Sequence, residues 1–182
     1  MGAGSYTVIK YAPKGDKLMT IEVGERPEKQ SQFSGTTDIA FGPNGRLFIT
    51  DGYGNARVLE YTPDGKRARQ WGKPGMGPGE FHLPHAIQID EDGVIYVADR
   101  ENGRIQKFDL NGKFLGEIPH LGRTYSLKLA GGVLWAGMSP LNEPTGAQGW
   151  AGKLDKRTGK MLGHVVVSER SGRTSVERRP AA

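Results

Sequence analysis

The strongest constraint in this sequence is an internal repeat, because residues 37–72 match residues 84–116 almost position by position. Thr37-Asp38-Ile39-Ala40-Phe41 aligns with Pro84-His85-Ala86-Ile87-Gln88-Ile89, Leu47-Phe48-Ile49-Thr50-Asp51 with Ile95-Tyr96-Val97-Ala98-Asp99, and Tyr61-Thr62-Pro63-Asp64-Gly65-Lys66 with Phe108-Asp109-Leu110-Asn111-Gly112-Lys113. The two segments are offset by 47 or 48 residues. A nearly constant offset of this size is typical of repeat architectures.

Each repeat contains four short runs of β-branched and aromatic residues, separated by turns that contain Asn-Gly, Asp-Gly or Asn. This pattern predicts a four-stranded antiparallel meander, and stacked meanders of this kind are the blades of a β-propeller. We therefore expect an all-β fold with full blades at 33–72, 81–118 and 124–167 and a half blade at 5–24. Residues 168–182 carry no strand pattern and are predicted to form a basic, disordered tail.

Residues that recur in both repeats, or that lie on the faces of blades, are expected to have structural roles. Neighbouring blades cover both faces of an internal blade, so its apolar side chains fill the space between blades. The aromatic residues expected there are Trp71, Phe81, Phe108, Phe114 and Trp135. Asp51 with Arg57, and Asp99 with Arg104, occupy matching places in the two repeats, which predicts a hydrogen-bond pattern that stabilises each blade.

Composition excludes several functional classes. The chain has no cysteine, which rules out disulfides and thiolate metal sites. Its net charge is +5, of which residues 168–182 supply +2 through four Arg and two Glu, so the rest is only mildly basic and nucleic-acid binding is not expected. No apolar run is long enough to span a bilayer and no secretory leader is visible, so no membrane association is predicted.

A motif of Asp, two or three residues, Asn, one residue, Arg and then Val or Ile follows an apolar strand twice, at Asp51 to Val58 and at Asp99 to Ile105, and it resembles the NHL repeat. A longer set of motifs resembles the peptidyl-α-hydroxyglycine α-amidating lyases, from about Phe33 to His164. These motifs are Asp51-Gly52-Tyr53-Gly54-Asn55-Ala56-Arg57, Trp71-Gly72, Gly77-Pro78-Gly79-Glu80-Phe81, Leu83-Pro84-His85 and Ala98-Asp99-Arg100-Glu101-Asn102-Gly103-Arg104-Ile105-Gln106. The resemblance implies an NHL-type β-propeller.

The lyase resemblance also implies a site on the propeller axis. Members of that family are six-bladed propellers that cleave the N–Cα bond of a C-terminal hydroxyglycine, with zinc held by one His from each of three alternate blades and calcium deeper in the channel. By this resemblance His85 is a zinc ligand, the carbonyl of Ile87 binds calcium, Tyr53 assists proton transfer and Arg100 lies in the active-site cavity. Zinc and calcium are therefore the cofactors expected.

The chain holds only about three and a half of the six blades that the resemblance implies. Two of the three zinc histidines would lie in the missing blades, and in the neighbouring blades Asp38 and Tyr125 occupy the positions that correspond to His85. An incomplete ring exposes two blade faces, so we expect self-association as a homodimer or a second chain that supplies the missing blades.

Two functions remain open at this point, and with them the question of whether the protein is an enzyme. The first is an NHL-repeat binding module that recognises a protein, peptide or small-molecule ligand through its rim loops and completes its ring by association. The second is a metal-dependent enzyme like the amidating lyases, acting at the axis on peptidyl-α-hydroxyglycine or a related small substrate. The resemblance implies an extracytoplasmic location. Fold alone does not separate the two functions.

Overall fold

The computed structural model describes residues 6–24, 35–143 and 148–166, and within these residues the strands form three four-stranded sheets and two two-stranded pairs. The sheets consist of β3 (Asp38–Phe41), β4 (Leu47–Asp51), β5 (Arg57–Tyr61) and β6 (Arg67–Trp71); of β9 (Pro84–Ile89), β10 (Ile95–Asp99), β11 (Arg104–Phe108) and β12 (Phe114–Ile118); and of β13 (Arg123–Ala130), β14 (Val133–Ser139), β15 (Trp150–Leu154) and β16 (Met161–Val166). The pairs are the antiparallel β1 (Thr7–Tyr11) and β2 (Lys17–Glu22) and the parallel β7 (Lys73–Pro74) and β8 (Glu80–Phe81). The expected all-β fold of four-stranded antiparallel blades is confirmed. The predicted tail, 168–182, lies outside the described residues.

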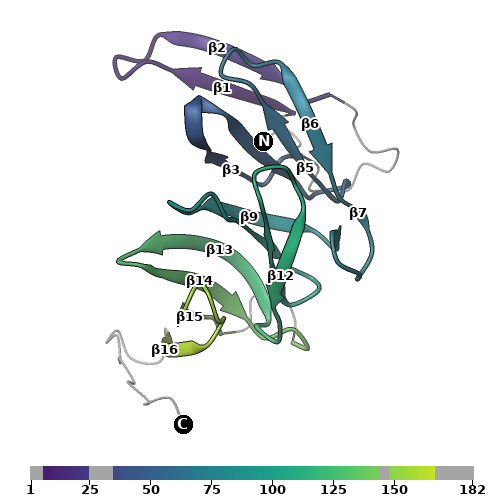
Figure 1. The fold of residues 1–182 in the computed structure, drawn as a ribbon, viewed down its shortest axis with the longest axis vertical. Helices are drawn as coiled ribbons and strands as arrows, with labels where there is room; N and C mark the ends of the chain where they lie inside the picture. The colour runs from purple at the N-terminus through teal and green to yellow at the C-terminus, as the bar shows by residue number, and fades with distance from the viewer. Residues whose placement is uncertain (1–5, 25–34, 144–147, 167–182) are drawn as a thin grey trace.

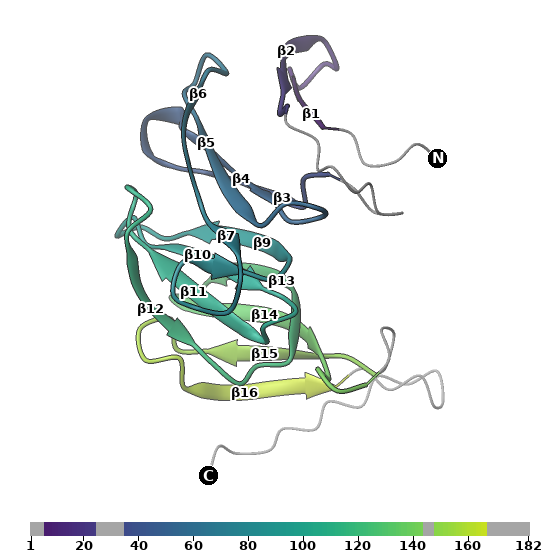
Figure 2. The ribbon, with the colours of Figure 1, turned by 90° about the vertical axis from the view of Figure 1, so that its right-hand side faces the viewer.

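The three sheets stack face to face in chain order along the long axis of the molecule (Figure 1). The hairpin of β1 and β2 lies at one end of the stack and the β13–β16 sheet at the other, so the described residues form an open arc and not a closed ring (Figure 2). β3, β9 and β13 are the first strands of their sheets, and β9 lies between the other two. In a propeller the first strands surround the central channel.

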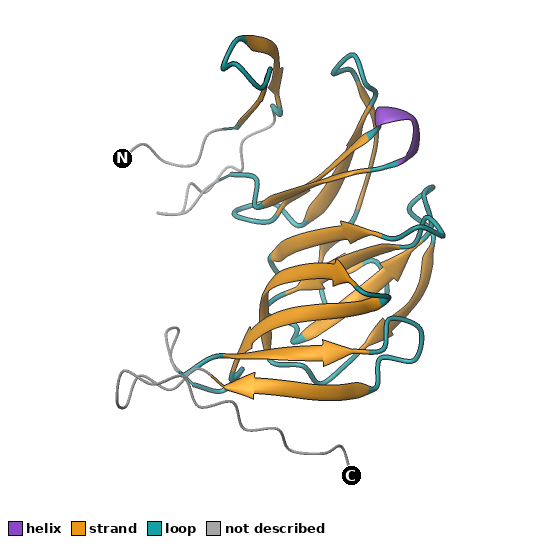
Figure 3. Ribbon diagram, turned by 90° about the vertical axis from the view of Figure 1, so that its left-hand side faces the viewer, coloured by secondary structure: helices purple, strands orange, loops and turns teal. Residues whose placement is uncertain are grey.

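Helical structure in the described residues is limited to one 3-10 turn, η1 (Pro43–Gly45), in the loop between β3 and β4 (Figure 3). None of the helices in that part of the chain is long and apolar enough to cross a membrane.

A separate hydrophobic cluster fills each space between neighbouring sheets. Successive side chains of a strand point to opposite faces, and β10 shows the result: Val97 belongs to the cluster toward the β3–β6 sheet, whereas Tyr96 belongs to the cluster toward the β13–β16 sheet. A third cluster joins the β1–β2 hairpin to the β3–β6 sheet through Ile21 and Ile49. The stack is therefore held by continuous apolar packing between consecutive units, as repeat proteins require.

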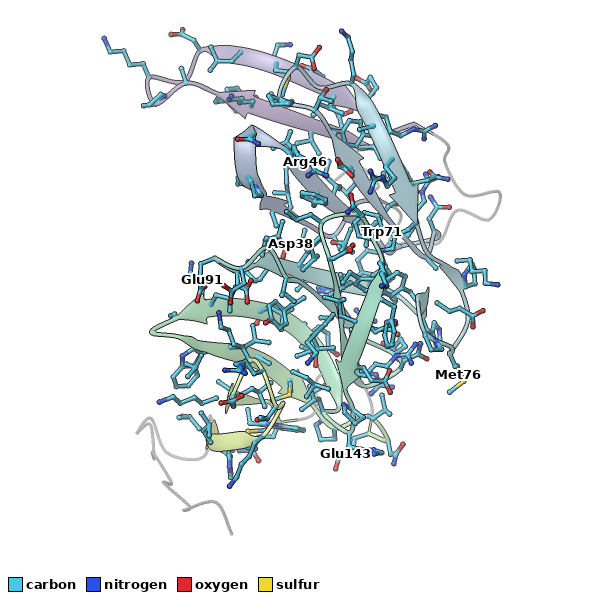
Figure 4. All side chains as sticks on the ribbon, in the orientation of Figure 1. Asp38, Arg46, Trp71, Met76, Glu91 and Glu143 are labelled. Atoms are coloured by element: carbon cyan, nitrogen blue, oxygen red, sulfur yellow. The ribbon has the colours of Figure 1, made fainter. Side chains whose placement is uncertain are left out.

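Four of the five aromatic residues assigned to blade packing lie in the cluster between the β3–β6 and β9–β12 sheets. Phe81 and Phe108 are fully buried there with ring centroids 5.8 Å apart, and Trp71 and Phe114 pack against them. Figure 4 shows Trp71 where these two sheets meet. Trp135 differs, because its strand neighbours Leu134 and Ala136 face the β9–β12 sheet and its own ring lies on the opposite face, 6.0 Å from Lys153 Nζ.

The repeated aspartates hold the ends of two blades through buried side-chain networks. Each carboxylate is 0% exposed and accepts hydrogen bonds from the Asn and the Arg that follow it in the motif. The donors are Asn55 Nδ2 and Arg57 Nε to Asp51 Oδ2, both at 2.9 Å, and Asn102 Nδ2 and Arg104 Nε to Asp99 Oδ2, both at 2.8 Å. The hydrogen-bond pattern predicted for these residues is present in both blades.

β9 carries a β-bulge at His85. Pro84 pairs with Asp99 and Ala86 pairs with Ala98 on β10, so His85 is an extra residue between two consecutive pairs. A bulge bends the strand and changes the direction of the extra side chain. The His85 side chain therefore does not follow the regular alternation of side chains between the two faces of β9, the first strand of its blade.

β13 carries a bulge at the equivalent place. Thr124 pairs with Met138 and Ser126 pairs with Gly137 on β14, which leaves Tyr125 as the extra residue. Two neighbouring first strands therefore carry a bulged residue at matching places, a histidine in one and a tyrosine in the next.

Gly52 allows the β3–β6 and β9–β12 sheets to approach each other beside these bulges. A Cβ at Gly52 would lie 2.1 Å from the backbone oxygen of Pro84. Because backbone cannot move aside cheaply, we expect Gly52→Ala to lower the free energy of unfolding by about 1–3 kcal/mol, measured by denaturant unfolding. Gly163→Ala, where an added Cβ meets nothing within 4 Å, should leave stability within about 0.5 kcal/mol. Equal effects of the two substitutions would contradict this close approach.

Candidate functional site

Tyr53, His85 and Arg100, the three side chains predicted for the site, converge at one end of the stack. Tyr53 follows β4 and Arg100 follows β10, so both leave neighbouring sheets at the same end, while His85 lies near the start of β9. Tyr53 Oη is 3.3 Å from His85 Nε2, and Arg100 Nη1 donates to Tyr53 Oη at 3.1 Å. The three side chains form one hydrogen-bonded chain that crosses two blades.

Backbone hydrogen bonds fix the loops that carry these side chains. The Arg100 N–H donates to the Leu83 carbonyl at 3.2 Å, which ties the loop after β10 to the segment before β9. Tyr53 forms a two-way antiparallel bridge with Gly35, with N···O distances of 3.2 and 3.3 Å. Main-chain contacts of this kind hold a site in place before any ligand arrives.

The second nitrogen of His85 determines its tautomer. Nδ1 lies 2.8 Å from the carbonyl oxygen of Tyr125, the bulged residue of β13. A carbonyl can only accept, so Nδ1 carries the proton and Nε2 is the acceptor of the neutral ring. The Tyr53 hydroxyl therefore donates to Nε2, and the hydrogen bonds run in one direction, from Arg100 through Tyr53 to His85.

The surroundings of His85 keep its ring neutral at pH 7. Burial lowers the pKa of His85 below its ordinary 6.5, and the charge of Arg100 acts in the same direction. The hydrogen bond to the Tyr125 carbonyl and the charges of Asp38 and Glu101 oppose this shift without reversing it. A neutral ring offers the Nε2 lone pair to a proton or to a metal ion.

Arg100 lies against two aromatic rings and is hydrogen-bonded along one edge. Its guanidinium carbon lies 5.8 Å from the centre of the Tyr53 ring and 5.1 Å from that of Tyr125, within the range of cation–π attraction. Its Nε donates to Glu101 Oε1 at 2.8 Å. Nη2 has no hydrogen-bond partner among the described residues, so the edge that carries Nη2 is available to an anion. A guanidinium edge of this kind suits a carboxylate.

The metal ligands implied by the resemblance are only partly present. The Nδ1–H of His85 is held by a carbonyl, as is usual for metal-binding histidines, and its Nε2 lies 3.3 Å from the Tyr53 hydroxyl. The Ile87 carbonyl accepts a hydrogen bond from Gln88 Nε2 at 2.9 Å. No three His, Cys, Asp or Glu side chains of the described residues lie close enough together to hold a metal ion. These residues therefore do not fit a complete catalytic zinc site, which normally has three protein ligands.

The expectation that Asp38 corresponds to His85 is wrong by one position. Asp38 pairs with Thr50 as Ala86 pairs with Ala98, and β3 has no bulge. The Asp38 carboxylate instead reaches the next first strand, where Oδ2 accepts a hydrogen bond from the Ile87 N–H at 3.0 Å. Figure 4 shows Asp38 between the β3–β6 sheet and β9. Its carboxylate therefore links two blades.

Two residues of the site were not assigned a role from sequence. Tyr125 supplies the carbonyl that orients His85 and a ring that covers Arg100, and Arg123 donates to Glu101 at 3.0 Å. Tyr125 could have been recognised from its alignment with His85, whereas nothing in the local sequence marks Arg123.

Comparison with protein families places the chain among propellers. The family model described as "6-bladed beta-propeller" matches residues 29–126, more than half of the chain. A solved structure, "Streptogramin B lyase structure", superimposes with a TM-score of 0.61 at 22% identity and covers 86% of this chain and 47% of that one. At that identity the likeness shows the fold alone.

Curated relatives match a similar region. Peptidyl-glycine alpha-amidating monooxygenase B of Xenopus laevis is 40% identical over 118 residues, which is 59% of this chain and 14% of the relative. A probable peptidyl-alpha-hydroxyglycine alpha-amidating lyase of Caenorhabditis elegans is 37% identical over 58% of this chain and 31% of its own length. NHL repeat-containing protein 3 of Homo sapiens is 34% identical over 64% of this chain and 36% of its own length. The chain thus spans between 14% and 36% of these relatives, which are of the NHL and amidating-lyase type, and it belongs to the six-bladed β-propeller family.

Proposed function

We propose that the chain forms the acid–base sector of a propeller that cleaves peptidyl-α-hydroxyglycine into a peptide amide and glyoxylate. The observation that carries the proposal is the one-directional hydrogen-bond chain from Arg100 through Tyr53 to His85 beside the channel. Relatives named as amidating enzymes support the choice of substrate class.

Each side chain of this sector has a distinct task. The open Nη2 edge of Arg100 binds the C-terminal carboxylate of the substrate, which directs the neighbouring α-carbon and its hydroxyl toward Tyr53. The Tyr53 hydroxyl is hydrogen-bonded to both Arg100 and His85. When its oxygen accepts a proton from the substrate, it can therefore pass its own proton to His85 Nε2. His85 is the base at the end of the chain, and the Tyr125 carbonyl stabilises its ring through Nδ1.

The reaction needs no external reagent. Tyr53 takes the proton of the substrate hydroxyl while its phenol proton passes to His85 Nε2. The oxygen electron pair forms the C=O bond of glyoxylate, and the N–Cα bond breaks with its electrons on nitrogen. The nitrogen then takes the proton back from the Tyr53–His85 pair, which yields the peptide amide. Because the pKa of His85 is lowered by burial and by Arg100, its imidazolium returns the proton readily.

A second candidate is a binding module that captures the C-terminal carboxylate of a peptide at the same Arg100 edge without cleaving it. The shared feature is the guanidinium that lies against the rings of Tyr53 and Tyr125. The two candidates differ only in the fate of the bound hydroxyglycine.

The experiment measures binding and turnover on one preparation. N-acetylglycine, which carries the carboxylate but not the hydroxyl, is titrated by calorimetry, and glyoxylate release from an N-acyl-α-hydroxyglycine is followed by a coupled assay. The lyase proposal predicts both binding and glyoxylate release. Binding of N-acetylglycine without glyoxylate release would contradict the lyase and support the binding module. Failure to bind N-acetylglycine would contradict both functions.

Zinc and calcium belong to this proposal only for a ring completed by further blades, as a homodimer or with a second chain, because no three possible ligand side chains of the described residues lie close enough together to hold a metal ion. Sedimentation and elemental analysis of the same preparation test this part. We expect about one zinc for each assembled ring. A stable single chain that binds stoichiometric zinc would contradict it.

A further inference from the structure

We propose that Glu101 and Arg123 are positioning residues, which hold the Arg100 guanidinium in the orientation that binds a carboxylate and connect it to the loop at residues 139–143. This inference rests on the proposed carboxylate site at Arg100. Neither residue touches the site of bond cleavage in the proposed reaction, so both would act through Arg100.

Two guanidinium groups share one carboxylate, and we call this set of three side chains, Arg100, Glu101 and Arg123, the relay. Arg100 Nε donates to Glu101 Oε1 at 2.8 Å and Arg123 Nε donates to Glu101 Oε2 at 3.0 Å. The side chains of Arg100, Glu101 and Arg123 are 12%, 18% and 17% exposed. Charge-assisted hydrogen bonds in such a sheltered place are geometrically restrictive. Glu101 therefore fixes the rotation of the Arg100 side chain about its Nε bond.

The charge of the relay favours an anionic ligand. Burial acts to raise the pKa of Glu101, but the hydrogen bonds and charges of Arg123 and Arg100 outweigh it and lower the pKa, so the carboxylate is ionised at neutral pH. Two positive charges then face one negative charge. A bound carboxylate on the Nη2 edge of Arg100 neutralises the remaining charge, which is worth more in a sheltered site than in water.

Arg123 also holds the loop that follows β14. Its Nη1 donates to the Pro140 carbonyl at 3.0 Å and to the Glu143 carbonyl at 2.7 Å. Glu143 lies at the end of the β13–β16 sheet (Figure 4). One side chain therefore joins Glu101, which orients Arg100, to a rim loop of the next blade.

The competing interpretation is that Arg123 only stabilises the contact between two blades. In that case its removal would lower stability and leave the Arg100 side chain and its ligand unaffected. The two interpretations differ in the exchange rate of the Arg100 Nε–H proton, because that proton is protected only while Glu101 stays in place.

The experiment compares Arg123→Met with Arg157→Met in the full chain. Arg157 is an exposed arginine of the same blade, so the control removes the same charge. The Arg100 Nε–H resonance, assigned by its absence from Arg100→Lys, is followed by NMR, and N-acetylglycine is titrated into each variant. Arg123→Met is expected to speed the exchange of that proton at least about tenfold and to weaken N-acetylglycine binding about five- to tenfold. Arg123→Lys, which can still pair with Glu101, should recover most of both losses.

The outcomes separate this inference from the proposed function. Unchanged Nε–H exchange and unchanged binding in Arg123→Met would overturn the relay, whatever happens to the melting temperature. If wild-type protein does not bind N-acetylglycine, the proposed function fails, and faster Nε–H exchange in Arg123→Met would still support the positioning of Arg100.

Discussion

Replacing Asp99 by alanine is expected to lower the free energy of unfolding by about 3–5 kcal/mol, because it removes one of the two carboxylates paired with the buried Arg104 guanidinium and leaves the other buried donors to Asp99 without this acceptor. Asp99 is 0% exposed and Arg104 is 8% exposed. Asp99 Oδ2 accepts from Arg104 Nε at 2.8 Å and Oδ1 accepts from the His82 N–H at 2.7 Å, so one carboxylate ties the blade end to the segment that leads into β9. Denaturant unfolding gives the loss directly, and the melting temperature should fall by about 6–20 °C.

Asp92→Ala is the matched control for this loss. The Asp92 side chain is 76% exposed, and its carboxylate lies 4.0 Å from Lys156 Nζ. Removing an exposed pair of this kind should change stability by less than about 0.5 kcal/mol. If Asp99→Ala were no more destabilising than Asp92→Ala, the recurring aspartate could not be the element that stabilises the blade end.

Arg100→Met is expected to weaken N-acetylglycine binding at least about 30-fold and to lower glyoxylate release about 100-fold, because the carboxylate loses its charge-assisted hydrogen bonds. Methionine is flexible enough to pack against the rings of Tyr53 and Tyr125, so the fold should be retained. Calorimetry and the coupled glyoxylate assay give the two numbers, and circular dichroism checks the fold.

Two further variants identify the cause of such a loss. Arg100→Lys keeps the charge but lacks the planar guanidinium, whose N–H groups can donate to Glu101, Tyr53 and a ligand at the same time. It should therefore recover only a small part of the N-acetylglycine binding that Arg100→Met loses. Arg157→Met removes an exposed positive charge and should leave binding unchanged. Wild-type affinity in Arg100→Met would place the carboxylate elsewhere and remove the basis for the axial site.

The blades were predictable because each is encoded locally. Alternating apolar runs and Asn-Gly or Asp-Gly turns determine a meander without reference to the rest of the chain. Even the bulge at His85 has a trace in the sequence: the offset between repeats is 47 residues from Thr37 to Pro84 but 48 from Leu47 to Ile95, and the inserted residue is the bulged one. Because of this one-residue shift, Asp38 corresponds to Ala86 and not to His85.

The site was predictable only in part, because several of its contacts arise from stacking. Tyr53, His85 and Arg100 lie in motifs with recognisable spacing, and the structure brings them together. The Tyr125 carbonyl, by contrast, reaches His85 across 40 positions of sequence through a contact between two first strands. Arg123 reaches Glu101 in the same way from the next blade. No local pattern specifies a contact between neighbouring blades.

The bulges at His85 and Tyr125 bear on how such a ring can acquire new chemistry. A paired residue of a first strand must suit both its cross-strand neighbour and the adjoining blade, so exchanging it disturbs the packing. A bulged residue lies outside the pairing of its sheet. The two bulges here carry different functional groups on equivalent backbone. Evolution or design can therefore exchange the side chain at one bulge at a time while the scaffold that supports it stays the same.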